Sequence, residues 1–121
     1  EREQVSLCAA EGIGILPYYP LAKGLLTGKY RRDAPAPEGS RLGGRGGGAN
    51  FDVLEALENF ATGRGFDLLT LAISWLACQP TTASVISGAS SPHQPAQNAA
   101  AGRWKMTPGD LVEIDRIVGN G

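Results

Sequence analysis

The apolar residues of this chain follow two patterns, short continuous runs and longer stripes with helical spacing. The runs Ile13–Tyr18 and Ala83–Ile86 predict two short buried strands, because brief apolar segments bounded by turn residues are typical of parallel sheets. The stripes predict helices over 1–11, from Phe51, over Leu68–Gln79, from Ser91 and from Thr107. Strands that alternate with helices indicate an α/β fold with a parallel sheet and right-handed crossovers.

Several of the predicted helices carry start signals. Asp67 is placed to cap the helix that follows it, and Ser91-Pro92-His93-Gln94 has the spacing of a capping box with proline at the first helical position. Thr107 begins the last helix in the same style, while Pro95 predicts a distorted first turn in the helix before it. The expected apolar faces are Val5, Cys8 and Ala9 in the first helix, Val53, Leu54, Leu57, Phe60 and Ala61 in the second, and Leu111, Ile114, Ile117 and Val118 in the last.

Two stretches are expected to be irregular. Pro20–Gly28 predicts a loop or a first helical turn, and the glycine- and proline-rich residues 31–50 predict a flexible loop. Within the latter, Arg41–Gly48 has a superficial likeness to the arginine–glycine segments that bind RNA. It holds two arginines and no interleaved aromatic residue, so a flexible loop, or an active-site lid, is the favoured interpretation.

The composition is that of a soluble globular protein, with 42% hydrophobic and 19% charged residues among 121. A net charge of −1 gives no support for a nucleic acid or an anionic membrane as a partner, and no apolar run approaches the roughly 18 residues that span a bilayer. The opening Glu-Arg-Glu-Gln does not predict a secretory signal peptide. Cys8 and Cys78 are expected to be buried reduced thiols without the spacing of a disulfide or a metal site, which favours a cytoplasmic location.

Candidate chemistry is concentrated in two segments. In Ile15–Tyr30, ILPYYPLAKGLLTGKY, a buried strand emerges into a loop with two glycines, which can approach an anionic ligand closely. Lys23 and Lys29 would add positive charge there. In Val85–Asn98, VISGASSPHQPAQN, hydroxyl groups precede a helix N-terminus, whose free backbone N–H groups favour a bound anion.

Together these segments resemble the C-terminal part of the aldo-keto reductases, eight-stranded α/β barrels that reduce carbonyl groups with NADPH. The matching residues of the family's seventh strand and loop are Tyr18, Pro20, Leu21, Gly24 and Leu26–Tyr30, and those of the eighth are Ile86, Gly88–Pro92, Gln94, Gln97 and Asn98. Arg64–Pro80 and Trp104–Asp115 also fit the family pattern, so the resemblance covers nearly the whole chain apart from 31–50. It implies one partial domain over 1–121, the last two strands and helices of a TIM (β/α)8 barrel, incomplete as given.

The resemblance also implies a cofactor site. Tyr18 would stack on the nicotinamide ring, and the loop of Leu21 and Gly24 would follow the pyrophosphate. The second loop would hold the adenosine 2′-phosphate, with Gln97 and Asn98 at the adenine edge. The implied cofactor-binding residues are Tyr18, Tyr19, Pro20, Leu21, Lys23, Gly24, Gly88, Ala89, Ser90, Ser91, Gln94, Gln97 and Asn98.

Some residues depart from the family pattern. Tyr19 stands where serine or asparagine is common, and Pro95 replaces an ordinary helix former. Neither Gly88 nor Gln94 is the lysine or arginine that pairs with the 2′-phosphate in many members. The implied cofactor is therefore NADP(H), with NAD(H) as the alternative.

The catalytic residues of the family have no counterpart in this sequence. The family's tyrosine, lysine, aspartate and histidine lie in the first half of the barrel, and His93, the single histidine here, is expected at the surface. Trp75 and Trp104 are expected to be packing residues. The resemblance implies the cofactor-binding part of a reductase of small carbonyl compounds, inactive and poorly folded in isolation. A truncated nucleotide-binding or partner-docking module is the alternative, ahead of a nucleic-acid binder, and the oligomeric state stays open.

Overall fold

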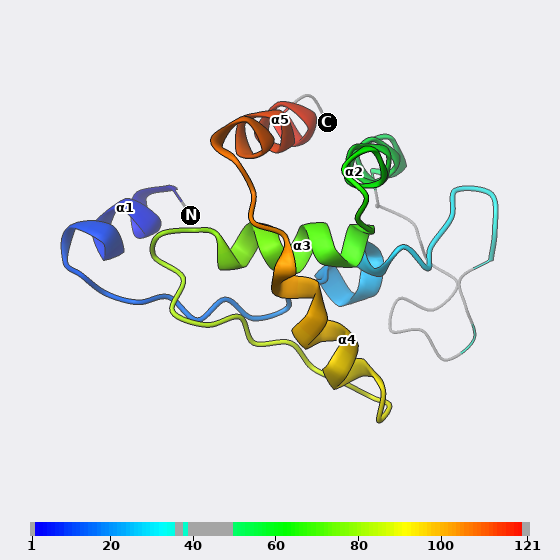
Figure 1. The fold of residues 1–121 in the computed structure, drawn as a ribbon, viewed down its shortest axis with the longest axis horizontal. Helices are drawn as coiled ribbons and strands as arrows, with labels where there is room; N and C mark the ends of the chain where they lie inside the picture. The colour runs from blue at the N-terminus through cyan, green and yellow to red at the C-terminus, as the bar shows by residue number, and fades with distance from the viewer. Residues whose placement is uncertain (1, 36–37, 39–49, 120–121) are drawn as a thin grey trace.

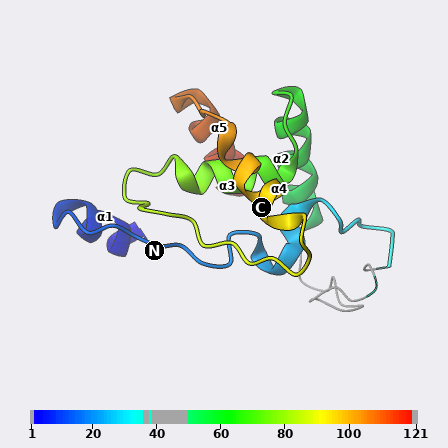
Figure 2. The ribbon, with the colours of Figure 1, turned by 60° about the horizontal axis from the view of Figure 1, so that its bottom comes forward.

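The computed structural model describes residues 2–35, 38 and 50–119, and its regular structure is mostly helical (Figure 1). The α-helices are α1 (Arg2–Ala10), α2 (Phe51–Gly63), α3 (Leu68–Ala77), α4 (Gln94–Ala100) and α5 (Pro108–Gly119), and the 3₁₀-helices are η1 (Ala22–Thr27) and η2 (Ala101–Arg103). In both ribbon views α3 runs through the middle, with α2 and α5 on one side and the extended segments 13–18 and 82–86 on the other (Figures 1 and 2). Within the described ranges no helix is long and apolar enough to cross a membrane.

Side-chain caps begin three of these helices. The carboxylate of Asp67 accepts a hydrogen bond from the Thr70 amide at 2.7 Å, as predicted for the start of α3. At α5 the box is reciprocal, because Asp110 Oδ2 accepts from the Thr107 amide at 2.9 Å while Thr107 Oγ1 accepts from the Asp110 amide at 3.2 Å. Asn50, which the sequence did not single out, caps α2 through the Val53 amide.

The predicted start of α4 is wrong by about one turn. The helix begins at Gln94, not at Ser91, and the Ser91 side chain makes no capping bond to it. Pro95 explains the delay, because it lies in the first turn and its ring fixes the local backbone. The Gln94 side chain still reaches back, accepting a hydrogen bond from the Ser90 amide at 2.6 Å.

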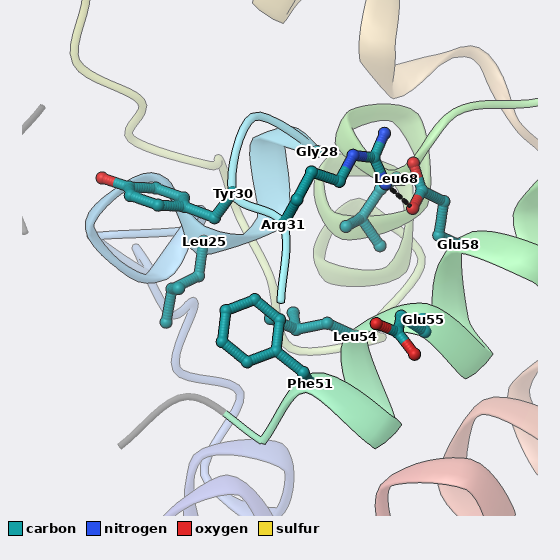
Figure 3. Close-up of a pocket in the computed structure, with 9 residues that line it drawn as sticks. All are labelled: Leu25, Gly28, Tyr30, Arg31, Phe51, Leu54, Glu55, Glu58 and Leu68. Atoms are coloured by element: carbon teal, nitrogen blue, oxygen red, sulfur yellow. Dashed lines mark hydrogen bonds and ion pairs between the residues drawn. The ribbon is translucent and has the colours of Figure 1, made fainter. Parts of the chain in front are cut away.

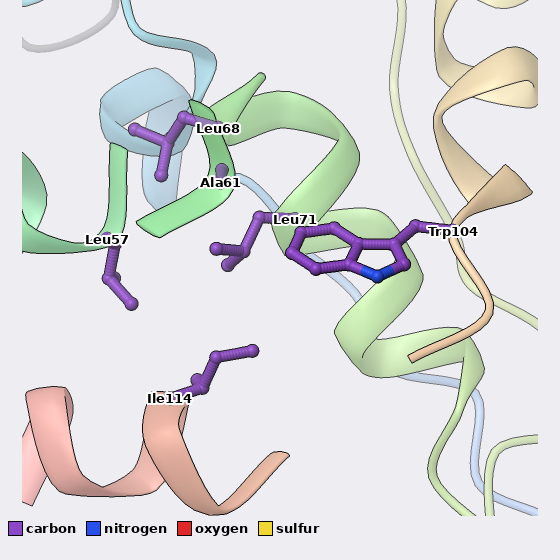
Figure 4. Packing of buried hydrophobic residues seen from close by; sticks show 6 residues of the cluster. All are labelled: Leu57, Ala61, Leu68, Leu71, Trp104 and Ile114. Atoms are coloured by element: carbon purple, nitrogen blue, oxygen red, sulfur yellow. The ribbon is translucent and has the colours of Figure 1, made fainter. Parts of the chain in front are cut away.

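The hydrophobic core lies between α2, α3 and α5, and its centre is Trp104 in the segment that joins η2 to α5. The Trp104 indole stacks on Phe66 with ring centres 4.6 Å apart and on Phe60 at 5.9 Å. The buried members of the cluster, drawn in Figure 4, are Leu57, Ala61, Leu68, Leu71, Trp104 and Ile114. The predicted packing roles of Trp104 and of the partly buried Trp75 are confirmed.

The two segments that were predicted to be buried strands form neither regular strands nor a buried sheet. Segments 13–18 and 82–86 meet only at two isolated parallel bridges, Ile15 to Thr82 and Tyr18 to Ile86. Their apolar residues are exposed, with 54% of Ile13, 54% of Leu16 and 52% of Ile86 accessible. Among the described residues each segment has the other as its sole pairing partner, so one edge and one face of each remain uncovered.

Other apolar positions are also less buried than predicted. Helix α1 stands apart from the core in Figure 1, and its Val5 is 40% exposed. Cys8 is only half-buried and Cys78 is exposed, although both are free thiols as predicted. His93 is exposed as expected. Most of the predicted flexible loop 31–50, including Arg41–Gly48, lies outside the described residues.

Candidate functional site

The two candidate segments run in parallel and end at the same edge of the molecule. The Ile15 amide donates to Thr81 O at 2.7 Å, the Ala83 amide to Ile15 O at 2.9 Å, and the Ile86 amide to Pro17 O at 3.0 Å. Tyr18 is therefore opposite Ile86, where both segments turn into their loops. Ligands of parallel α/β folds bind at this carboxyl end of the strands.

The first loop, residues 19–28, has an unusual backbone. Three non-glycine residues, Tyr19, Ala22 and Lys23, have positive φ angles of 56°, 46° and 59°, and Gly24 follows at 101°. Each such non-glycine residue costs about 1–3 kcal/mol and persists only where its surroundings fix it. Clusters of this kind are common at ligand-binding loops.

Aromatic surface is exposed where the first segment ends. Tyr18 and Tyr19 are 72% and 59% accessible, and their ring centres lie 5.1 Å apart at an angle of 58°. Pro20 behind them is buried and Leu21 is half-buried, so these two residues support the loop while the tyrosines face outward. The flat face of a tyrosine in this position can stack on a planar ring.

The second loop presents small residues and amide groups. Gly88, Ala89 and Ser90 are exposed, and the Asn98 side chain on α4 donates to Gly88 O at 3.4 Å. Ser90 is held by Gln94, through its amide at 2.6 Å and its hydroxyl at 3.3 Å. The loop backbone is thus tied to the first turns of α4 while its outer surface stays open.

Helix α3 supports both loops, because η1 and α4 each pack against it. A shallow hollow of about 270 Å³ opens between the second loop and α4. Its lining residues are Ile73 from α3, Val85, Ser87 and Ala89 from the loop, and Pro95, Asn98 and Ala99 from α4. Of the predicted site residues, Ala89 and Asn98 line this hollow.

A second pocket lies on the far side of the first loop, between η1 and α2 (Figure 3). It measures about 20 Å³, the space of roughly one water molecule. Arg31 and Glu58 form an ion pair across it and Phe51 lies at its rim. A pocket of this size cannot hold a nucleotide. It marks the contact between the first loop and α2, which the Arg31–Glu58 ion pair bridges.

The sequence segments that carry the two loops contain no acidic residue, in contrast to the whole chain. No Asp or Glu occurs from Gly12 to Arg32 or from Leu68 to Gly109, and Lys23 and Lys29 are exposed. Arg32 is paired with Asp52 and Glu55 of α2, whose hydrogen bonds raise its pKa further. The two exposed lysines therefore remain the cations nearest the strained loop in sequence, which suits an anionic ligand.

Two other predicted site residues, Gln97 and Ser91, do not line the hollow. Gln97 is exposed on α4 and does not line the hollow, while Ser91 is half-buried, with its hydroxyl 3.4 Å from His93 Nε2. Ile73, Ser87 and Pro95 line the hollow but were not predicted. Ser87 lies within the second segment, between two residues that match the family pattern, and could have been included. Ile73 lies fourteen residues before Ser87 in the apolar run of α3, and nothing in the sequence marked it.

No metal centre forms in the part of the chain that the structure describes, since no three His, Cys, Asp or Glu side chains there could hold one ion. The arrangement offers backbone, aromatic and cationic groups for binding.

Comparison with known proteins agrees with this geometry. Residues 1–118 match the model of the aldo/keto reductase family. The chain is 33% identical over 122 residues to L-glyceraldehyde 3-phosphate reductase of Escherichia coli O157:H7, which covers 91% of this chain and 35% of the relative. It is 34% identical over 109 residues to a probable voltage-gated potassium channel subunit beta of Oryza sativa subsp. japonica, covering 84% and 33% of the two chains.

Two further proteins are similar over nearly the whole chain. NADH-specific methylglyoxal reductase of Escherichia coli K12 is 32% identical over 124 residues, covering 93% of this chain and 36% of the relative. The structure of glycerol dehydrogenase from Gluconobacter oxydans superposes with a TM-score of 0.75 at 24% identity, covering 96% of this chain and 37% of that one. The chain thus spans about a third of the length of these relatives. It belongs to the aldo/keto reductase family.

Proposed function

We propose that this chain is the C-terminal, cofactor-binding part of an NAD(P)H-dependent reductase that converts aldehydes or ketones to alcohols. The main support is the pairing of Tyr18 with Ile86, because it brings both family motifs to one edge. The complete enzyme would act on a small carbonyl compound in the cytoplasm. When bound, the cofactor would supply the hydride, and this chain would bind and orient it.

The described residues fit a dinucleotide. Tyr18 offers an exposed ring for the nicotinamide, while Gly24, Lys23 and Lys29 offer a close backbone approach and positive charge for the pyrophosphate. The second loop would take the adenosine end through Gly88, Ala89, Ser90 and Ser91, with Gln94, Gln97 and Asn98 from α4. These residues, together with Tyr19, Pro20 and Leu21 from the first loop, make up the proposed cofactor site.

The preference between the two nicotinamide cofactors is part of the proposal. Residues 85–100, which include the second loop, contain no lysine or arginine to pair with a 2′-phosphate. One relative bears the name NADH-specific, so NADH is a serious alternative to NADPH. We propose NADP(H) as the cofactor, with NAD(H) accepted at this site.

A graft tests this function directly. The chain replaces the matching third of the Escherichia coli L-glyceraldehyde 3-phosphate reductase, so that the missing strands are restored. We expect a cooperative melt, titratable binding of NADPH or NADH, and reduction of L-glyceraldehyde 3-phosphate. A graft that folds and binds neither nucleotide would contradict the proposal. Titration of the 121-residue chain with both nucleotides provides a second measurement if the graft does not fold.

A charge substitution locates the phosphate within the graft. Gln94→Glu keeps the oxygen that accepts from the Ser90 amide but adds a negative charge. If the 2′-phosphate lies here, affinity for NADPH falls about tenfold more than affinity for NADH, because like charges at about 4 Å repel by about 1 kcal/mol or more. Gln4→Glu on exposed α1 is the matched control. Equal losses for both nucleotides would place the phosphate elsewhere.

The second candidate function, a partner-docking module, is favoured by one observation. The exposed Ile13, Leu16 and Ile86 leave apolar surface along the paired segments. The relative from Oryza sativa is named as a channel subunit, so the family includes a protein of that description. Native mass measurement of the chain in its source cells separates the two, since a module would persist at 12.6 kDa in a complex that contains no reductase activity.

A further inference from the structure

We propose that Thr27 and Tyr30 are positioning residues that fix the strained loop 19–24 from beneath. The inference rests on the proposed function for its consequence, which is nucleotide affinity. Neither residue belongs to the proposed cofactor-binding set, and neither is needed to touch the nucleotide. Their role follows from what holds the unfavourable backbone of the loop in place.

Thr27 acts through the carbonyl of Gly24. Its hydroxyl donates a hydrogen bond to Gly24 O at 2.7 Å and is itself partly buried. The Gly24 and Leu26 amides both donate to Leu21 O, at 2.8 and 3.2 Å. These three bonds close the loop around the residues with positive φ, and Thr27 supplies the one that comes from a side chain.

Tyr30 acts through the shape of its ring. The side chain is 6% exposed, and its Cε2 lies 3.5 Å from the position that a Cβ on Gly24 would occupy. The Lys29 side chain comes nearer, at 3.0 Å, and its Nζ lies over the Tyr30 ring at 5.3 Å from the ring centre. Figure 3 shows the ring turned away from Phe51 and Glu55, toward the ribbon of η1. The hydroxyl is buried and has no hydrogen-bond partner among the described residues, so the ring and not the hydroxyl does the supporting.

Both residues are themselves held from outside the loop. Leu26, next to Thr27, packs against the hydrophobic core. Arg31, next to Tyr30, is paired with Glu58 of α2. The loop is thus clamped between the core and α2, and side chains at positions 27 and 30 transmit this support to Gly24.

Amide hydrogen exchange on the folded graft tests the positioning role without any nucleotide. The readout is the protection of the Gly24 and Leu26 amides. Thr27→Val and Tyr30→Leu are expected to speed their exchange at least tenfold, while Thr27→Ser and Tyr30→Phe stay near wild type. Unprotected Gly24 and Leu26 amides in the wild type, or unchanged protection in Thr27→Val, would overturn the inference.

Nucleotide titration of the same variants tests the consequence. We expect Thr27→Val and Tyr30→Leu to weaken NADPH binding at least fivefold, with recovery in Thr27→Ser and Tyr30→Phe. Thr62→Val, at an exposed position of α2, is the matched control, because it alters a threonine away from the loop. If the wild-type graft folds and binds no nucleotide, the proposed function fails, and the exchange result still decides the positioning role.

Discussion

At the scale of single residues, Asp110 is the charged residue that is most deeply buried in the part of the chain that the structure describes. Its side chain is 2% exposed, and one carboxylate oxygen accepts bonds from the amide and hydroxyl of Thr107, both at 2.9 Å. The other oxygen lies 2.9 Å from Arg64 Nη2, an ion pair without the alignment of a hydrogen bond. The bonds from Thr107, helped by the charge of Arg64, lower the pKa of Asp110 against the opposing effect of burial.

This arrangement predicts a pH dependence of stability. A carboxyl group whose folded pKa is depressed stabilises the fold above its unfolded pKa of about 3.9, and this contribution is lost as the pH falls through the lower folded value. Asp110→Asn removes the charge-assisted cap and should cost about 1–3 kcal/mol near neutral pH. In thermal melts the variant should lose less stability than the wild type below about pH 4. Asp115→Asn, exposed on the same helix, is the control, and parallel pH profiles would contradict the argument.

At the scale of elements, α3 packs against α2, α4, η1 and η2, and the Ser74 side chain links α3 to η2 through hydrogen bonds. The Ser74 side chain is fully buried; its hydroxyl donates to Ala101 O at 2.7 Å and accepts from the Trp104 amide at 3.1 Å. One hydroxyl therefore satisfies two backbone groups in the core. A small polar residue inside an apolar helix gave no sign of this role in the sequence.

Ser74→Ala should destabilise the chain by about 1–3 kcal/mol, because two buried backbone groups lose their partner. Urea unfolding, followed by the fluorescence of Trp104 and Trp75 in and beside the core, measures the change. Ser84→Ala, at an exposed position between the bridges, should stay within about 0.5 kcal/mol of wild type. Equal urea midpoints for the two variants would show that the hydrogen bonds of Ser74 contribute nothing to stability.

Helices were predicted better than strands, and the reason is physical. An apolar stripe such as that of Leu57 and Ala61 is buried by neighbouring helices of this same chain, and both residues are buried as expected. A run such as Ile13–Tyr18 reports burial that needs further strands on either side. Those partners do not lie within the described residues, so the same apolar pattern ends as exposed surface.

At the scale of the whole molecule, the exposed apolar segments predict uneven stability in the isolated chain. Segments 13–18 and 82–86 and helix α1 should exchange their amides quickly, whereas α3 and the surroundings of Trp104 should be protected. We expect strong binding of a hydrophobic dye, a broad melt, and no carbonyl reduction. A sharp cooperative melt without dye binding, or measurable reductase activity, would contradict this picture.

The candidate site shows the same division between what the sequence determined and what only tertiary structure decided. The motifs around Tyr18 and Gly88 were readable in the sequence, because glycines, hydroxyls and aromatic residues at set spacings carry local information. The family followed from those residues. The anchoring of the first loop through Leu26 and Arg31, the bridge from Tyr18 to Ile86 and the exposure of the strands depend on contacts between distant segments. Such contacts are set by the neighbours that the fold supplies, and a local pattern contains no record of them.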